Sequence, residues 1–354
     1  METERRAFLD DLLSCSTPSG FETTGQRRWL DYVEPYADET RVDAYGNAVA
    51  VSEGRDDAPS IAVTGHGDEI GLMVRDITDD GFVKLTRIGG SDRTVTRGQH
   101  VTVHTDDGAL DGVIGQVAIH LRDSGDDEYN EIAEQYVDIG VEDGEEAEDR
   151  VDIGDPITLT TRVTDLADDR VAARGMDNRV GIWTAAETFR RAVQADAKAT
   201  VYAVSTVQEE VGLKGAQMIG FDLEPDAVVA VDVTHATDQP ESPGDKGSGV
   251  DLGDGPVVAR GSANHPAIVE AVRSVGVDAE VDLQLSAAGS RTGTDADAFY
   301  TSAGGIPALN LGLPNRYMHT PVEVVDLNDL EAAAELLAAF AARFEEFAPF
   351  RADI

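Results

Sequence analysis

Short apolar runs of strand length alternate with segments of helical spacing along this chain. Strand-like runs cover residues 61–65, 201–207, 227–231, 281–286 and 307–313, and a pair of short strands is expected within 41–51. Apolar positions at helical spacing predict helices over residues 3–15, 23–37, 178–193, 265–276, 295–302 and 328–346. This alternation predicts an α/β domain with a mixed sheet flanked by helices.

The pattern changes between residues 71 and 165. Short alternating runs, separated by Gly and Asp turns, appear there at 82–85, 100–104, 112–115, 136–139 and 157–160. Close spacing of this kind is typical of a small all-β barrel or sandwich. We therefore predict a β domain at 71–165, inserted into an α/β domain made of 1–70 and 166–354. Two acidic segments inside the insert, 122–133 and 142–150, have no clear pattern and are expected to be loops, the first of them partly disordered.

The apolar runs of the α/β part end in residues that can bind metal ions. These candidates are His66 and Asp68 after the first run, Glu209 and Glu210 after the second, Asp232 within the third, and His319 after the last. In open α/β sheets, ligands bind in the crevice beyond the carboxyl ends of the strands. Histidines and carboxylates gathered there predict a site for divalent cations.

Individual positions in this set carry their own signals. Asp232 lies in an otherwise apolar strand, where a carboxylate is costly unless it is paired or bound to a metal. Asp177 stands at a helix start, where one oxygen could cap the helix while the carboxylate also bridges two cations. Glu209 and Glu210 point in different directions, so one can bind a metal and the other can act as a base toward a bound water. Asp68 is placed to fix the tautomer of His66.

The net charge of the chain excludes some classes of binding partner. Of 354 residues, 68 are acidic and 28 basic, so the net charge is -40, and only four of the basic residues are lysines. Such a chain repels nucleic acid and anionic membranes. Because the acid is spread along the whole sequence, it indicates adaptation to a salt-rich cytoplasm, where the repulsion is screened. A single cysteine and the lack of any apolar run near 18 residues predict a cytoplasmic protein with no membrane span.

Several of these segments, taken together and in order, resemble the TET-type, glutamyl-aminopeptidase-like metallo-aminopeptidases of the zinc-exopeptidase clan. The matching segments are Thr17–Glu22, Asp43–Asn47, His66–Glu69, Gly115–His120, Gly175–Arg179, Gln208–Gly212, Val231–Val233, Gly293–Ala296 and Tyr317–Pro321. The resemblance implies a zinc-exopeptidase-like fold whose β insert, PDZ-like or barrel-shaped, is a dimerisation domain. It also implies peptide substrates and assembly of dimers into a hollow tetrahedral dodecamer.

The resemblance also implies roles for the site residues. One cation, zinc or cobalt, would be held by His66, Asp177 and Asp232. A second would be held by Asp177, Glu210 and His319, with Asp177 shared between the two. Glu209 would be the general base and acid, and Asp68 would orient His66. The acidic loop 122–133 departs from the family pattern, and in relatives this region can reach toward a neighbour's active site.

Three other functions stay open from the residues. A deacylase or carboxypeptidase of the same clan would need a cation for the substrate carboxylate, and Arg291 and Arg316 are candidates. A glycosidase would need two carboxylates facing each other across a sugar, which leaves the histidines unused. A scaffold that has lost its site would not need competent ligands at all five positions. The preferred N-terminal residue is not readable from the sequence.

Overall fold

The computed structural model describes residues 1–122, 129–240, 242 and 249–351. Its larger part is an eight-stranded mixed sheet in the order β1-β2-β12-β3-β13-β16-β14-β15. The strands of this sheet are β1 (Glu39–Val42), β2 (Ala48–Ser52), β3 (Ser60–His66), β12 (Thr200–Thr206), β13 (Ala227–His235), β14 (Val257–Arg260), β15 (Gln284–Ala287) and β16 (Ala308–Asn315). The central strands β12, β3, β13 and β16 are parallel, so their carboxyl ends meet at one edge.

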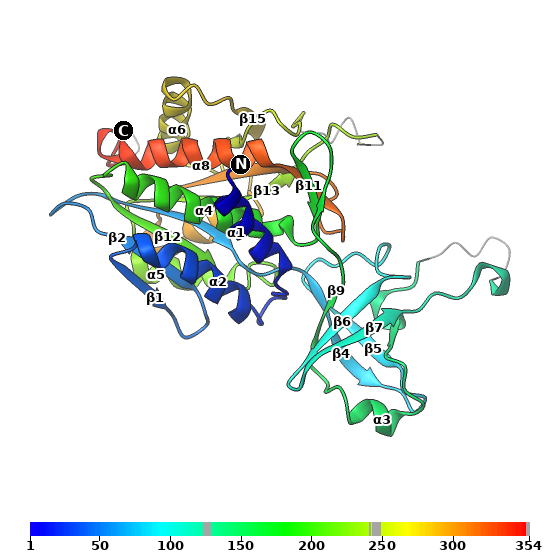
Figure 1. Cartoon of the computed structure of the whole chain (residues 1–354). Helices are drawn as coiled ribbons and strands as arrows, with labels where there is room; N and C mark the ends of the chain where they lie inside the picture. The colour runs from blue at the N-terminus through cyan, green and yellow to red at the C-terminus, as the bar shows by residue number, and fades with distance from the viewer. Residues whose placement is uncertain (123–128, 241, 243–248, 352–354) are drawn as a thin grey trace.

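Helices cover both faces of the sheet (Figure 1). One face carries α1 (Thr3–Ser14), α2 (Thr23–Val33), α4 (Met176–Gln194), α6 (Pro266–Asp278) and α8 (Leu327–Ala342). The other carries α5 (Lys214–Leu223) and α7 (Asp295–Phe299). The fold is therefore the predicted mixed α/β architecture.

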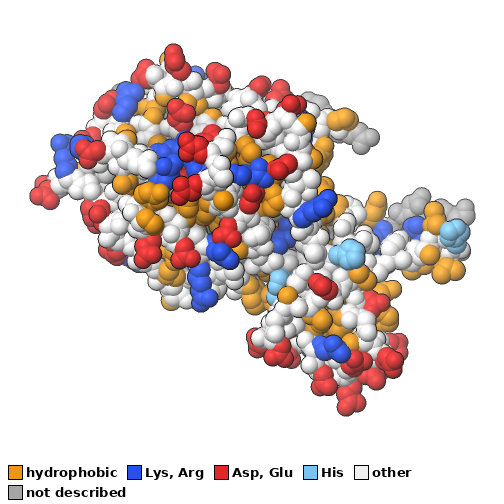
Figure 2. Space-filling model, in the orientation of Figure 1, with side chains coloured by type: hydrophobic (Ala, Val, Ile, Leu, Met, Phe, Trp, Pro, Cys, Tyr) orange, Lys and Arg blue, Asp and Glu red, His pale blue; other side chains and the backbone are white. Residues whose placement is uncertain are grey.

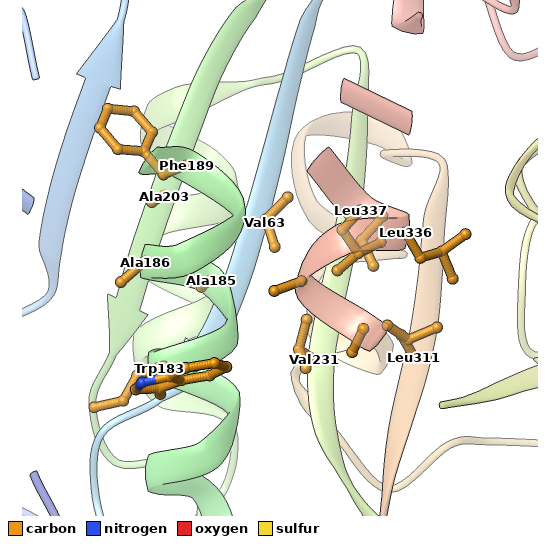
Figure 3. Packing of buried hydrophobic residues seen from close by; sticks show 14 of the residues in the cluster. Val63, Trp183, Ala185, Ala186, Phe189, Ala203, Val231, Leu311, Leu336 and Leu337 are labelled. Atoms are coloured by element: carbon orange, nitrogen blue, oxygen red, sulfur yellow. The ribbon is translucent and has the colours of Figure 1, made fainter. Parts of the chain in front are cut away.

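The largest core cluster lies under α4 and α8. Trp183 and Phe189 of α4 belong to this cluster, and Phe189 lies beside Ala203 (Figure 3). Val63 and Leu337 lie on the side of α4 that faces α8. These side chains are fully buried, and burying one large apolar side chain contributes roughly 1.5–3 kcal/mol. The tight packing fixes the height of α4 above the sheet, and with it the start of that helix beside the strand ends.

The predicted insert forms a closed six-stranded barrel in the order β4-β5-β8-β7-β6-β9. The barrel projects from the α/β body (Figure 1). Its strands are β4 (Gly71–Ile77), β5 (Val83–Ile88), β6 (His100–Thr105), β7 (Gly108–Ile114), β8 (Tyr136–Asp138) and β9 (Pro156–Leu159). All of them fall within residues 71–165, and the division into two domains stays a prediction. Acidic side chains are spread over the visible surface of both parts, among basic and apolar ones (Figure 2).

The structure corrects several predicted elements. The segment 142–150 is not all loop, because Asp143 accepts a hydrogen bond from the Glu146 amide (2.9 Å) and caps the short helix α3 (Gly144–Glu148). Helix α5, strand β14 and a small sheet of β10 (Thr164–Asp165), β11 (Arg170–Ala173) and β17 (Glu323–Asp326) were not predicted. These short elements depend on tertiary packing, which local spacing does not report.

Other predicted bounds shift by a few residues. Helix α7 ends at Phe299 and α8 at Ala342, each followed by 3-10 turns, at Ser302–Gly304 and Phe344–Glu346. Three further 3-10 turns are Glu34–Tyr36, Ile119–Leu121 and Ile132–Glu134. Half of the segment 122–133, which was predicted to be partly disordered, lies outside the described residues, at 123–128.

A buried carboxylate joins the N-terminal segment, the end of β3 and the start of α4. Glu69 is 2% exposed and accepts hydrogen bonds from Arg174 (2.6 Å), from Arg179 and from the Thr17 amide (3.0 Å). Arg179 also donates to the Cys15 carbonyl (2.9 Å). Burial opposes ionisation of Glu69, but the charges of Arg174 and Arg179 outweigh it and lower its pKa to about 2.

We predict that Glu69→Gln lowers the free energy of unfolding at pH 7 by about 3–5 kcal/mol, because two buried guanidinium groups lose their counter-charge. Since the folded pKa lies below the usual 4.5, this stabilisation is complete above about pH 4.5 and is lost as the pH falls toward 2. Urea unfolding at constant salt measures the difference, with the exposed Glu4→Gln as the matched control. Equal midpoints for Glu69→Gln and wild type at pH 7 would show that the prediction is wrong.

Candidate active site at the carboxyl ends of the parallel strands

The ends of β3, β12 and β13 bring the predicted site residues together. His66 is the last residue of β3, and its Nε2 atom lies 3.1 Å from Asp177 Oδ1 and 3.6 Å from Asp232 Oδ1. Glu209 follows β12, with Oε2 3.9 Å from the same nitrogen. The side chains of all four residues are buried.

His319 completes the cluster from the loop between β16 and β17. Its Nε2 atom lies 3.3 Å from Asp177 Oδ2 and 3.5 Å from Glu210 Oε1. Asp177 therefore presents one carboxylate oxygen to each imidazole. Six of the seven residues predicted for the site thus lie in one place.

The predicted helix cap at Asp177 is wrong. The helical conformation is interrupted at Asp177 and Asn178, and it is the Asn178 side chain that accepts the Gly181 amide (2.9 Å), as a cap does. The Asn178 amide group also donates to the Val231 carbonyl of β13 (2.8 Å). Because Asn178 both caps the helix and ties it to the sheet, both oxygens of Asp177 are left to face the histidines.

Asp68 organises the turn that carries the two glutamates. Its carboxylate accepts hydrogen bonds from the Ser19 hydroxyl (2.6 Å) and from the amides of Glu209 (3.0 Å) and Glu210 (3.2 Å). Its Oδ1 atom also lies 3.3 Å from His66 Nδ1, and its backbone carbonyl 3.1 Å from that nitrogen. Burial opposes ionisation of Asp68, but hydrogen bonds and the charge of His66 outweigh it and lower its pKa. The predicted contact of Asp68 with His66 is present, and so is a contact with both glutamates that was not predicted.

Burial and mutual repulsion dominate the electrostatics of the cluster. Burial raises the pKa values of Glu210 and Asp232, and the charge of Asp177 adds to both shifts. Burial likewise raises the pKa of Glu209, to about 9. Asp177 is the exception, because hydrogen bonds to His319 and His66 outweigh its burial and keep its pKa well below the usual range. The carboxylates of the cluster outnumber its two imidazoles, so a bound positive charge would stabilise their ionised forms.

The donor set fits divalent cations. Ligand atoms of His66, Glu209 and Asp232 lie within 4.8 Å of one another, and so do those of His66, Asp177 and Glu210. Imidazole nitrogens combined with carboxylate oxygens suit zinc and similar first-row ions.

Two buried acids near the cluster were not predicted as site residues. Glu323 of β17 accepts the amides of Asp177 (2.9 Å) and His319 (3.1 Å), which ties two predicted ligands to one carboxylate. Asp295, at the start of α7, accepts the Thr206 hydroxyl (2.5 Å), and its charge raises the pKa of Glu209. The local signal for Glu323 is weaker than for Asp232, because Glu323 opens the short strand β17, which also ends in an acid, whereas Asp232 lies inside a long apolar strand.

The fold is a mixed α/β body with an inserted closed barrel, and the ends of its parallel strands gather histidines and carboxylates that could hold divalent cations. The sequence profile of the M42 glutamyl aminopeptidase family matches residues 46–336. The lysyl aminopeptidase of Pyrococcus furiosus is 34% identical over 336 residues, 94% of either chain. The chain belongs to the M42 glutamyl aminopeptidase family, and it is a peptide hydrolase.

Solved structures agree with this assignment. The TET aminopeptidase of the marine sediment archaeon Thaumarchaeota archaeon SCGC AB-539-E09 superimposes with a TM-score of 0.90, at 31% identity over 97% of either chain. The TET1 peptidase of Pyrococcus horikoshii, which can assemble into a tetrahedron or a large octahedral shell, gives a TM-score of 0.84 at 31% identity, over 95% of this chain and 99% of that one. The family predicted from the sequence is thereby confirmed.

We predict that Asp68→Asn lowers kcat/KM and divalent-cation affinity by about 10–100-fold, as is usual when the partners of metal-binding residues are changed. The side-chain amide of Asn has an NH₂ group in place of one acceptor oxygen. This NH₂ group would face the backbone N–H of Glu209 or Glu210, so two hydrogen-bond donors would meet and one hydrogen bond would be lost. Peptide hydrolysis and calorimetric cation titration measure the two effects. Ser19→Ala removes one donor and keeps the carboxylate, so it should lose much less, and equal losses in both variants would contradict this role of Asp68.

Proposed function

We propose that this aminopeptidase releases N-terminal amino acids from peptides with two divalent cations, zinc or cobalt, and Glu209 as general base. The observation that carries the proposal is the placement of Asp177, with one oxygen toward His66 and the other toward His319. A carboxylate shared in this way is the usual device for holding two cations near each other. When bound, the cations would polarise the scissile carbonyl and make the attacking water more acidic.

The distances support a division of the donors into two sets that share Asp177. His66 and Asp232 would hold one ion with Asp177, and Glu210 and His319 would hold the other. Glu209 is also within ligand reach, but it lies farther from His66 Nε2 (3.9 Å) than Asp177 (3.1 Å) or Asp232 (3.6 Å) does. We therefore place Glu209 outside both donor sets.

Glu209 would move the proton of the reaction. It takes a proton from the water that attacks the first peptide carbonyl, and it then gives that proton to the leaving amine. Burial raises the pKa of Glu209, which favours the protonated form that the amine needs. The two cations would lower this pKa, so that the carboxylate could first take the proton of the water. Asp68 holds the Glu209 amide through its carboxylate and so fixes where this side chain starts.

The structure favours the aminopeptidase over the alternatives. Arg316, which a carboxypeptidase could use to hold a substrate carboxylate, is instead bound to Asp238 (2.7 Å). Arg291, the other candidate, is exposed. A glycosidase would leave His66 and His319 without a role. A scaffold that has lost its site would not need histidines and carboxylates gathered at the strand ends.

We also propose that copies of this chain assemble through the barrel into dimers and a tetrahedral dodecamer. Large apolar side chains are exposed between β7 and β8, on a segment that extends away from the barrel (Figure 1): Ile119 is 69% and Leu121 79% exposed. Burying such side chains against another copy would be favourable. None of the helices in the described part of the chain is long and apolar enough to cross a membrane. A cytoplasmic, salt-rich setting stays a prediction.

The decisive experiment is hydrolysis of short peptides at high salt by protein stripped with a chelator and then given zinc or cobalt. We expect release of N-terminal residues only, only after a cation is returned, and none from N-acetylated copies of the same peptides. The panel also reveals the preferred N-terminal residue. Cleavage from the C-terminus alone, or no cleavage of free-amine peptides despite bound cation, would instead indicate a carboxypeptidase or deacylase. Activity that survives the chelator would favour a carboxylate-only hydrolase.

Two neighbouring substitutions separate the base from the ligand. Glu209→Gln should lower kcat by about 10²–10⁴-fold while both cations still bind, because only the proton acceptor is lost. Glu210→Gln, the same change one residue further on, should weaken cation binding instead. Isothermal titration with zinc and peptide hydrolysis distinguish the two outcomes, and an active Glu209→Gln variant would eliminate Glu209 as the base.

A further inference from the structure

A turn of the barrel reaches the candidate active site. Strand β3 ends at His66, and β4 of the barrel begins at Gly71, so only four residues separate them. Strand β5 runs antiparallel to β4 and pairs Ile88 with Gly71. The chain therefore leaves the site on β4 and returns to it at the end of β5, in the turn Ile88–Ser91.

The two glycines of this turn lie against the ligands of the second proposed cation. A Cβ atom built on Gly90 would stand 2.8 Å from both Nδ1 and Cε1 of His319, closer than real side chains approach. A Cβ atom on Gly89 would stand 3.2 Å from Glu210 Cβ and 3.3 Å from its Oε2 atom. The backbone of the turn thus occupies the space behind both side chains.

The contact with His319 is on the edge of the ring that faces away from the other donors. His319 Nε2 faces Asp177 and Glu210, so the Nδ1 edge is the one against Gly90. The Gly90 backbone lies at this edge as a hydrogen-bond acceptor for the ring. A ligand histidine commonly has its second nitrogen held by a backbone carbonyl or a carboxylate, which fixes the tautomer and the ring orientation.

The turn is itself fastened in place. The Ser91 hydroxyl donates to the Gly71 carbonyl (2.7 Å) and to the Ile88 carbonyl (3.2 Å). A cavity at this junction is lined by Ser91 and Thr96 from the barrel and by His319 and Pro321 from the α/β body. The barrel and the body therefore meet at His319.

We propose that Gly89 and Gly90 are positioning residues of the active site, which hold Glu210 and His319 in the geometry that binds the second cation. This inference rests on the proposed function, because it assumes two cations with the donor sets given above. It gives the barrel a role in the chemistry of its own subunit, besides any role in assembly. A side chain at position 90 would push the His319 ring away from Asp177 and Glu210.

The test measures the binding of Co²⁺ to the Gly90→Ala variant. Calorimetry and the visible absorption of bound Co²⁺ report the binding. The His319 ring is partly exposed and at the end of a side chain, so it can move without unfolding the protein. We expect the dissociation constant of one Co²⁺ to rise by about 10–100-fold, while that of the other stays within about threefold of wild type. Excess Co²⁺ should restore most of the peptidase activity by mass action, and the unchanged affinity for the other ion distinguishes this effect from a general folding defect.

The matched control is Gly289→Ala, since Gly289 also has ordinary backbone angles and a Cβ atom added there would meet open space. It should bind both ions like wild type. Ser91→Ala is a second test variant, which adds no atoms and removes the hydrogen bonds that hold the turn. It should lower the affinity for the same ion by a smaller factor. If Gly90→Ala and Ser91→Ala both bind two ions like wild type, the positioning role is overturned and the proposed function stands. If wild type binds fewer than two ions, the dinuclear assignment fails, and this inference fails with it.

Discussion

Repulsion among buried carboxylates is the constraint around which this structure is arranged. Parallel strands bring their carboxyl ends to one edge of the sheet, and the acids that follow those strands meet there away from water. Each acid is compensated in a different way. Glu69 has two arginines, Asp68 has two amides and a hydroxyl, and Asp177 has two imidazoles. Glu210 and Asp232 are left with raised pKa values, and this remaining demand for positive charge favours divalent cations at the cluster.

The place where the barrel is inserted follows from the same edge of the sheet. Because β4 starts just after the His66–Glu69 segment, the first hairpin of the barrel must return to the site. Its turn can approach His319 closely only because glycines occupy positions 89 and 90. An insertion made elsewhere in the sheet would have built a barrel without contact to the donor set. The architecture therefore brings a hairpin of the barrel against the candidate donor set.

Much of the site was predictable from local sequence, because strand ends and ligand types are both local features. Asp232 stood out as an acid in an apolar strand, and His66 with Asp68 as a histidine beside its own partner. The cap at Asp177 was predicted wrongly, since the choice between Asp177 and Asn178 depends on where β13 places the Val231 carbonyl. Helix α5 was missed because it has no side-chain cap and contains two glycines, Gly215 and Gly220, which weaken the local helix signal. Strand β14 was missed because four residues are too few to show a period.

The sequence by itself determined the α/β class, the inserted barrel and the identity of the donors, because periodicity and residue type are set by the chain alone. Only the tertiary structure decided which oxygen faces which imidazole, since that depends on the packing of α4 against the sheet. It also decided that Glu323 ties Asp177 to His319, and that Gly90 lies against His319. These contacts join residues far apart in the chain, and no local pattern carries their distances.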